Sequence, residues 1–120
     1  MKPTARETAE RDRLFRALAD GTRRTVLDAL RERDGRTLGE LEAVIAAAGR
    51  DMTRFAVMKH LRVLEEAGLV VTHKAGRFKH HYLNIVPLQQ ALDEWIEPML
   101  AKPMARAMLQ LKAKIEGEEK

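Results

Sequence analysis

Hydrophobic residues recur at helical spacing through the first half of the chain. Apolar positions three and four residues apart predict helices over roughly residues 5–19 and 21–33. A third helix is expected between Thr37 and Gly49, and a fourth from Asp51 or Thr53 to about Ala67. Four helices in succession indicate a mostly helical domain.

Capping residues mark several of these ends. Thr4 with Glu7, and Thr37 with Glu40, have the spacing at which a hydroxyl and a carboxylate satisfy each other's backbone amides at a helix start. Gly68 stands where a helix commonly ends in the left-handed conformation. The predicted helices therefore have chemically defined limits.

The hydrophobic period changes after Gly68. Residues 69–74 and 77–83 are rich in β-branched and aromatic side chains and are joined at Ala75-Gly76, which predicts a β-hairpin. Pro87 suits the first position of a fifth helix. We expect Pro98 and Pro103 to interrupt or kink the chain before a last helix over about residues 104–116.

Short helices followed by a hairpin define the expected fold class: mostly α with a small β-hairpin wing, a winged helix-turn-helix. A length of 120 residues predicts one domain, 1–120, with terminal dimerisation helices around a core of about 20–84. The polar start and the lack of a long apolar run lead us to expect a soluble cytoplasmic protein without a membrane segment.

Composition argues against an enzyme. The chain has no cysteine, which excludes disulfides, thiolate metal sites and a cysteine nucleophile. It has no serine either, which excludes a serine nucleophile. It also has no glycine-rich phosphate loop. We expect no catalytic residues and no cofactor.

The net charge of +4 is concentrated in one segment. Between Arg50 and His81 there are seven Lys or Arg and three acidic residues, a net charge of +4, and the rest of the chain is neutral. Such clustering is typical of a surface that binds a polyanion, although charge alone would also allow a merely solvated basic face.

The fourth helix can divide its faces as a DNA-recognition helix must. Val57, Leu61 and Leu64 would face the core, while polar residues would meet the major groove and the wing would contact phosphate or the minor groove. The candidate DNA-binding residues are Thr53, Arg54, Phe55, Met58, Lys59, His60, Arg62, Lys74, Arg77 and Lys79.

Residues 52–70, MTRFAVMKHLRVLEEAGLV, resemble the recognition helix of ArsR/SmtB-type repressors, with His60-Leu61, Val63-Leu64 and Ala67 to Val70 matching the family's pattern. Residues 14–30 resemble its first two helices, and Gly76-Arg77 with Tyr82-Leu83 fit its wing. The resemblance, which covers about 14–84, implies a transcriptional repressor that binds double-stranded DNA as a homodimer.

Two departures from the family pattern matter. Its metal sensors use cysteines on the third helix or Asp and His clusters on the last, and this chain has neither, so it resembles a metal-independent branch. Met58 stands where many members carry a serine that touches DNA.

Dimerisation would use apolar stripes that the core does not need. The candidate interface residues lie at the two ends of the chain: Leu14, Phe15, Leu18, Met104, Met108, Leu111 and Ile115. We expect the first and last helices to pack together across a two-fold axis, with part of the first stripe also serving the monomer core.

Other interpretations stay open for some residues. His80-His81 could bind a metal, but adjacent strand residues point to opposite faces. Arg23-Arg24 could reach phosphate, with a solvated helix face as the simpler interpretation. Trp95 with Met99 and Met104 could line a ligand pocket, with core or dimer packing favoured because methionine fills irregular interfaces.

Two further functions compete with a DNA-binding repressor. One is a protein-interaction module on a winged-helix scaffold, since fold alone does not fix function. The other is a repressor released by a small organic ligand, which the region around Trp95 would hold.

Overall fold

The computed structural model describes residues 2–118, with the side chains of residues 101, 102 and 118 outside that description. The chain forms two compact units, residues 1–88 and 89–120. The candidate DNA-reading core of about 20–84 lies within the first unit.

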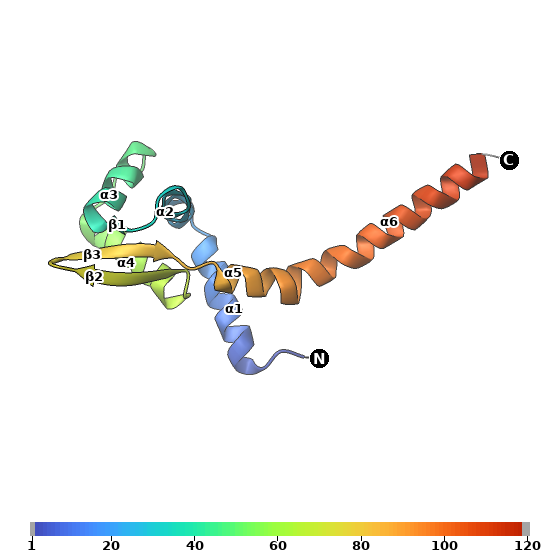
Figure 1. Cartoon of the computed structure of the whole chain (residues 1–120), viewed down its shortest axis with the longest axis horizontal. Coiled ribbons are helices and arrows are strands. Elements are labelled where there is room, and N and C mark those ends of the chain that lie inside the picture. The colour runs from blue at the N-terminus through green and yellow to red at the C-terminus, as the bar shows by residue number, and fades with distance from the viewer. Residues whose placement is uncertain (1, 119–120) are drawn as a thin grey trace. The chain divides into compact units, whose positions relative to one another are not determined.

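Four helices build most of the first unit: α1 (Ala5–Leu18), α2 (Gly21–Glu32), α3 (Leu38–Ala47) and α4 (Arg54–Glu66) (Figure 1). Both predicted capping boxes are present. Thr4 and Thr37 accept from the backbone N–H groups of Glu7 and Glu40, whose carboxylates accept from the Thr backbone N–H groups in return. Asp20 caps α2 and Thr53 caps α4, each through a bond to the N–H three residues on.

The hairpin consists of β2 (Val70–Ala75) and β3 (Phe78–Leu83). Its two-residue loop is Gly76-Arg77, and only Gly76 has a positive φ, of 64°, which is the pattern of a type II′ turn. The loop therefore lies one residue later than the predicted Ala75-Gly76 junction.

The structure contains a third strand, β1 (Arg36–Thr37), that the sequence did not predict. It pairs antiparallel with β3, Arg36 opposite His81 and Thr37 opposite His80, to give the sheet order β1-β3-β2. This strand fixes the wing to the segment that leads into α3.

The core of the first unit draws on every helix and on the base of the hairpin. Its largest fully buried side chains are Val26, Leu30, Leu41, Ile45, Val57, Leu64, Leu69 and Val70. Burying each such side chain contributes about 1.5–3 kcal/mol, so this core holds α4 and the wing firmly in place.

The C-terminal elements differ from the prediction. Helix α5 (Val86–Ala91) begins one residue before Pro87, and a π-helical segment, η1 (Leu92–Ile96), leads into α6 (Glu97–Glu118). The expected interruption at Pro98 and Pro103 was wrong. Pro98 follows the π-helical η1 directly, within a continuous helical run, and α6 continues through Pro103.

Candidate nucleic-acid interface

The candidate recognition helix α4 is held by one buried face. Val57, Leu61 and Leu64 are at most 4% exposed, as their spacing predicted. At the start of the helix the Thr53 hydroxyl oxygen accepts from the Ala56 N–H at 3.1 Å. The Thr53 hydroxyl proton can still be donated outward.

The opposite face of α4 gathers half of the predicted DNA-binding residues. At 100° per residue their positions fall within an arc of about 140°. These residues are Arg54, Phe55, Met58, Lys59 and Arg62, and all five are exposed. One side of a single helix therefore presents three cations and two large apolar side chains.

Two of these cations have a neighbour within the chain. Arg54 Nη1 lies 3.5 Å from Glu42 Oε1 of α3, and both side chains are accessible to water. Lys59 Nζ lies 5.4 Å from the centroid of the Phe55 ring, in a cation–π arrangement. Such exposed contacts are weak and exchange easily for a phosphate. Sequence reasoning did not single out Glu42, because no local pattern links it to α4.

His60 lies at the edge of the same helix and turns toward α2. Its Nδ1 atom is 3.0 Å from Arg23 Nη1 and 3.8 Å from Asp20 Oδ1, and its side chain is 21% exposed. The structure thus places this candidate in a contact within the domain.

The Asp20 carboxylate faces competing influences. Partial burial alone would raise its pKa, but the hydrogen bond from the backbone N–H of Arg23 and the charge of the Arg23 guanidinium lower the pKa below its ordinary value. Asp20 therefore stays ionised beside the recognition helix.

The side chains of Arg23 and Arg24 are bound to the end of α1. Arg23 donates to Ala17 O from Nε and to Arg16 O from Nη2, at 2.8 and 2.9 Å. Arg24 donates to Leu18 O at 2.7 Å. For half-buried Arg23, the interpretation of a solvated helix face was wrong, because its guanidinium satisfies carbonyls that a helix end leaves unpaired.

The wing carries the remaining predicted contacts. Lys74 and Lys79 stand directly opposite each other on β2 and β3, and Arg77 occupies the turn. Lys79 Nζ lies 3.7 Å from Glu65 Oε1 at the end of α4, and the Arg77 guanidinium lies 6.0 Å from the Phe78 ring centroid. Like charges directly opposite each other destabilise a sheet, and a bound anion would relieve the repulsion between Lys74 and Lys79.

His80 and His81 hold the wing to β1. Their Nδ1 atoms lie 2.8 Å from Gly35 O and 2.9 Å from Arg36 O, respectively. A carbonyl only accepts, so each Nδ1 carries a proton, and these nitrogens are used in the fold. His81 is also buried, at 3% exposed. Within residues 2–118, no group of three or more His, Asp or Glu side chains is placed to hold a metal ion.

The predicted dimer residues fall into two classes. Leu14 is buried in the core of its own protomer, whereas Phe15 and Leu18 are half-buried. On α6 the stripe of Met104, Met108, Leu111 and Ile115 is 49–69% exposed. The structure contains one protomer and leaves their role in dimerisation a prediction.

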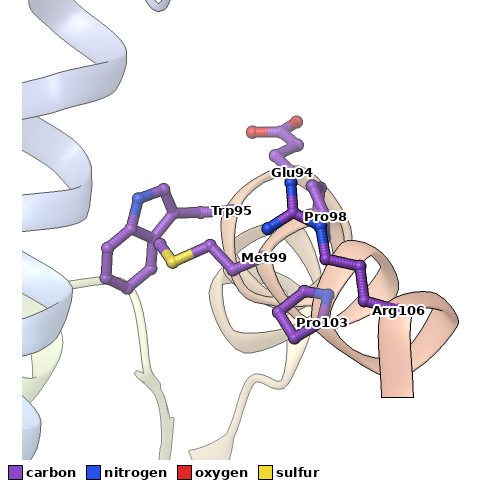
Figure 2. Close-up of a pocket in the computed structure, with 6 residues that line it drawn as sticks. All are labelled: Glu94, Trp95, Pro98, Met99, Pro103 and Arg106. Carbon is purple, nitrogen blue, oxygen red and sulfur yellow. The ribbon is translucent and has the colours of Figure 1, made fainter. Parts of the chain in front are cut away.

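An open hollow of about 680 Å³ lies along the start of α6 (Figure 2). Figure 2 shows the indole of Trp95 and the side chain of Met99 extending to the same side of the helix. Glu94, Pro98, Pro103 and Arg106 complete its lining. Met104, which the sequence analysis grouped with Trp95, is not among the lining residues. None of the helices in the described part of the chain is both long enough and apolar enough to span a membrane.

A helical pair joined by the short link of residues 48–53, followed by a β-hairpin packed beside the second helix, is a winged helix-turn-helix. Residues 18–73 match the family model described as a helix-turn-helix domain.

The chain is 44% identical over 88 residues to the Bacillus subtilis HTH-type transcriptional regulator YuzN, covering 72% of this chain and 96% of that one. It is 29% identical over 80 residues to the B. subtilis transcriptional repressor SdpR, covering 67% and 82% of the two chains.

Among solved structures, it is similar to a crystal structure of an ArsR family transcriptional regulator, with a TM-score of 0.62 and 30% identity over 90% of this chain and 97% of the other. The chain belongs to the ArsR family of helix-turn-helix transcriptional regulators, as the recognition-helix motif indicated.

Proposed function

We propose that this protein is a sequence-specific transcriptional repressor that binds a palindromic operator as a homodimer and needs no metal ion. The observation that carries the proposal is the exposed arc of α4, where Arg54, Lys59 and Arg62 surround two apolar side chains. The similarity to a protein named as a transcriptional repressor supports the direction of regulation.

The positions of α4 and the wing assign them to different parts of the DNA. The N-terminal half of α4 would meet base edges in the major groove, where recognition helices place their first residues. Lys74, Arg77 and Lys79 on the wing would bind backbone phosphates, and the Thr53 hydroxyl would donate to another. A protein-interaction module would not require cations on both α4 and the wing.

Binding assays with matched variants test the DNA interface. Arg54→Ala and Lys59→Ala should each weaken operator binding by about 1–3 kcal/mol if they contact bases. Arg31→Ala is the control, because Arg31 lies on α2, outside the proposed interface, and pairs with Asp28 on an exposed surface. Equal affinities for all four proteins would refute the interface.

The stripe on α6 supports the homodimer. Met104, Met108, Leu111 and Ile115 follow 4-3-4 spacing, so they form one continuous apolar side of the helix. A contiguous exposed apolar surface is typical of a binding interface, and a two-fold axis lets the same stripe serve both protomers. Phe15 and Leu18 of α1 would complete the contact.

Charge insertion tests this interface. Met108→Glu with Leu111→Glu should give a monomer with an intact first unit and weak operator binding, as measured by light scattering and DNA titration. Gln110→Glu with Ala113→Glu, on the opposite side of α6, is the matched control and should stay dimeric. A dimeric Met108→Glu/Leu111→Glu protein with normal operator affinity would place the interface elsewhere.

The available ligands support metal-independent binding. The sequence has no thiolate, and the Nδ1 atoms of His80 and His81 already donate to carbonyls. Zinc, cadmium or arsenite should therefore leave operator affinity unchanged. A stoichiometric zinc site that weakens DNA binding at least tenfold would contradict this part of the proposal.

A further inference from the structure

Two large apolar side chains lie on the face of α4 that carries the cations. Phe55 is 68% exposed and Met58 is 45% exposed, although the core-facing residues of the same helix are almost completely buried. The two are three residues apart, which makes them neighbours on the helix surface. They form a small apolar patch near the start of the recognition helix.

The cations lie around this patch. At 100° per residue, Arg54 and Lys59 occupy the two edges of the exposed arc, and Phe55 and Met58 lie between them. Arg62 follows Met58 one turn further along. Arg54 is drawn toward Glu42 at 3.5 Å, and Lys59 lies against the Phe55 ring at 5.4 Å. The surface is thus apolar in the middle and positive at its rim.

This arrangement matches one group in the major groove. Phosphates flank the groove and attract the peripheral cations, while the only apolar group on its base edges is the C5-methyl of thymine. A phenyl ring and a thioether have no N–H or O–H group to donate to the acceptor atoms of a base, but they gain by covering a methyl group.

We propose that Phe55 and Met58 read thymine methyl groups, so that each operator half-site carries thymine where α4 enters the groove. This inference rests on the proposed function and specifies which chemical feature of the operator the protein selects. The three surrounding cations favour this polyanionic ligand over a protein partner or a second copy of the chain on the same patch.

Deleting single methyl groups from the DNA provides the test. The full-length protein first selects its preferred duplex from a random pool, and each thymine of that duplex is then replaced by deoxyuridine. Replacement at the contacted position should weaken binding about fourfold for each methyl, the effect of uncovering one buried methyl group. Thymines elsewhere should show no such effect.

Protein variants assign the effect to the patch. With Phe55→Ala and Met58→Ala combined, the thymine and deoxyuridine duplexes should bind equally well. Both side chains are exposed, so this variant should keep the wild-type circular dichroism spectrum. The matched control is Arg62→Ala, which keeps the patch and should retain the fourfold ratio at a lower overall affinity.

Each outcome has a separate meaning. Selective DNA binding without any deoxyuridine effect would overturn the inference and leave the proposed function standing. A deoxyuridine effect that persists in Phe55→Ala/Met58→Ala would assign the methyl contact to another residue and also overturn it. Failure to select any duplex from the pool would instead refute the proposed function.

Discussion

Arg23 of α2 and His60 of α4 meet through a nitrogen–nitrogen contact, with Arg23 Nη1 3.0 Å from His60 Nδ1. A guanidinium only donates, so Nδ1 accepts and the His60 ring is neutral with its proton on Nε2. The same guanidinium donates to Ala17 O and Arg16 O. One side chain therefore connects the end of α1, the start of α2 and the recognition helix.

Removing this connection should destabilise the fold. Arg23→Ala leaves two carbonyls and one half-buried imidazole without a donor, so we expect a loss of about 2–3 kcal/mol in unfolding free energy, measured by urea denaturation. Arg24→Ala is the matched control, because it removes the bond to Leu18 O at the same helix end and should cost less than about 1 kcal/mol. Equal losses would show that the contact with His60 contributes nothing.

The start of α3 should make the domain sensitive to acid. Hydrogen bonding to the Arg33 guanidinium, then to the Thr37 backbone N–H, lowers the pKa of Glu40 from 4.5 to about 2. A lowered pKa in the folded state stabilises the fold above the unfolded-state pKa, and this contribution is lost as pH falls from about 4.5 to about 2. Glu40→Gln should therefore flatten the stability curve over this range.

A double-mutant cycle isolates the partner of Glu40. Arg33→Met should reduce the same acid dependence, and adding it to Glu40→Gln should have no further effect on the slope between pH 2 and 4.5. If the slope of the wild-type protein survives in Glu40→Gln, the helix cap does not account for the acid sensitivity.

The opposed lysines of the wing should lower the stability of the fold and raise its affinity for DNA. Lys74 stands directly opposite Lys79, and like charges in that position repel. Lys74→Thr should stabilise the protein by about 0.2–1 kcal/mol in thermal unfolding and weaken DNA binding. Lys74→Arg, which keeps the charge, should change neither property appreciably. A Lys74→Thr protein that binds DNA as tightly as the wild type would remove this residue from the interface.

Local chemistry determined how much of the fold the sequence could predict. Thr4, Thr37 and Gly68 act on residues within one turn, and their capping roles were identified correctly. The strand β1 has only two residues and forms because Arg36 pairs with His81, far along the chain. No local pattern could reveal such a strand.

The same distinction applies to the site. Helical spacing placed the exposed residues of α4 correctly, because that division depends on periodicity alone. The contact between Arg23 and His60 joins residues 37 positions apart, and the ion pair of Lys79 with Glu65 joins two elements. Pro103 was expected to interrupt or kink the chain before the last helix. However, its missing N–H removes only one bond of a long helix with strong helix formers on both sides.

Selection of duplex DNA from a random pool by the purified full-length protein tests the central claim most directly. A repressor that places two copies of α4 in successive major grooves should enrich a two-fold symmetric sequence with half-sites about 10 base pairs apart. The affinity for that sequence should fall steeply as salt rises, because phosphate contacts release counterions. Failure to enrich any sequence, or binding that ignores salt, would contradict the account.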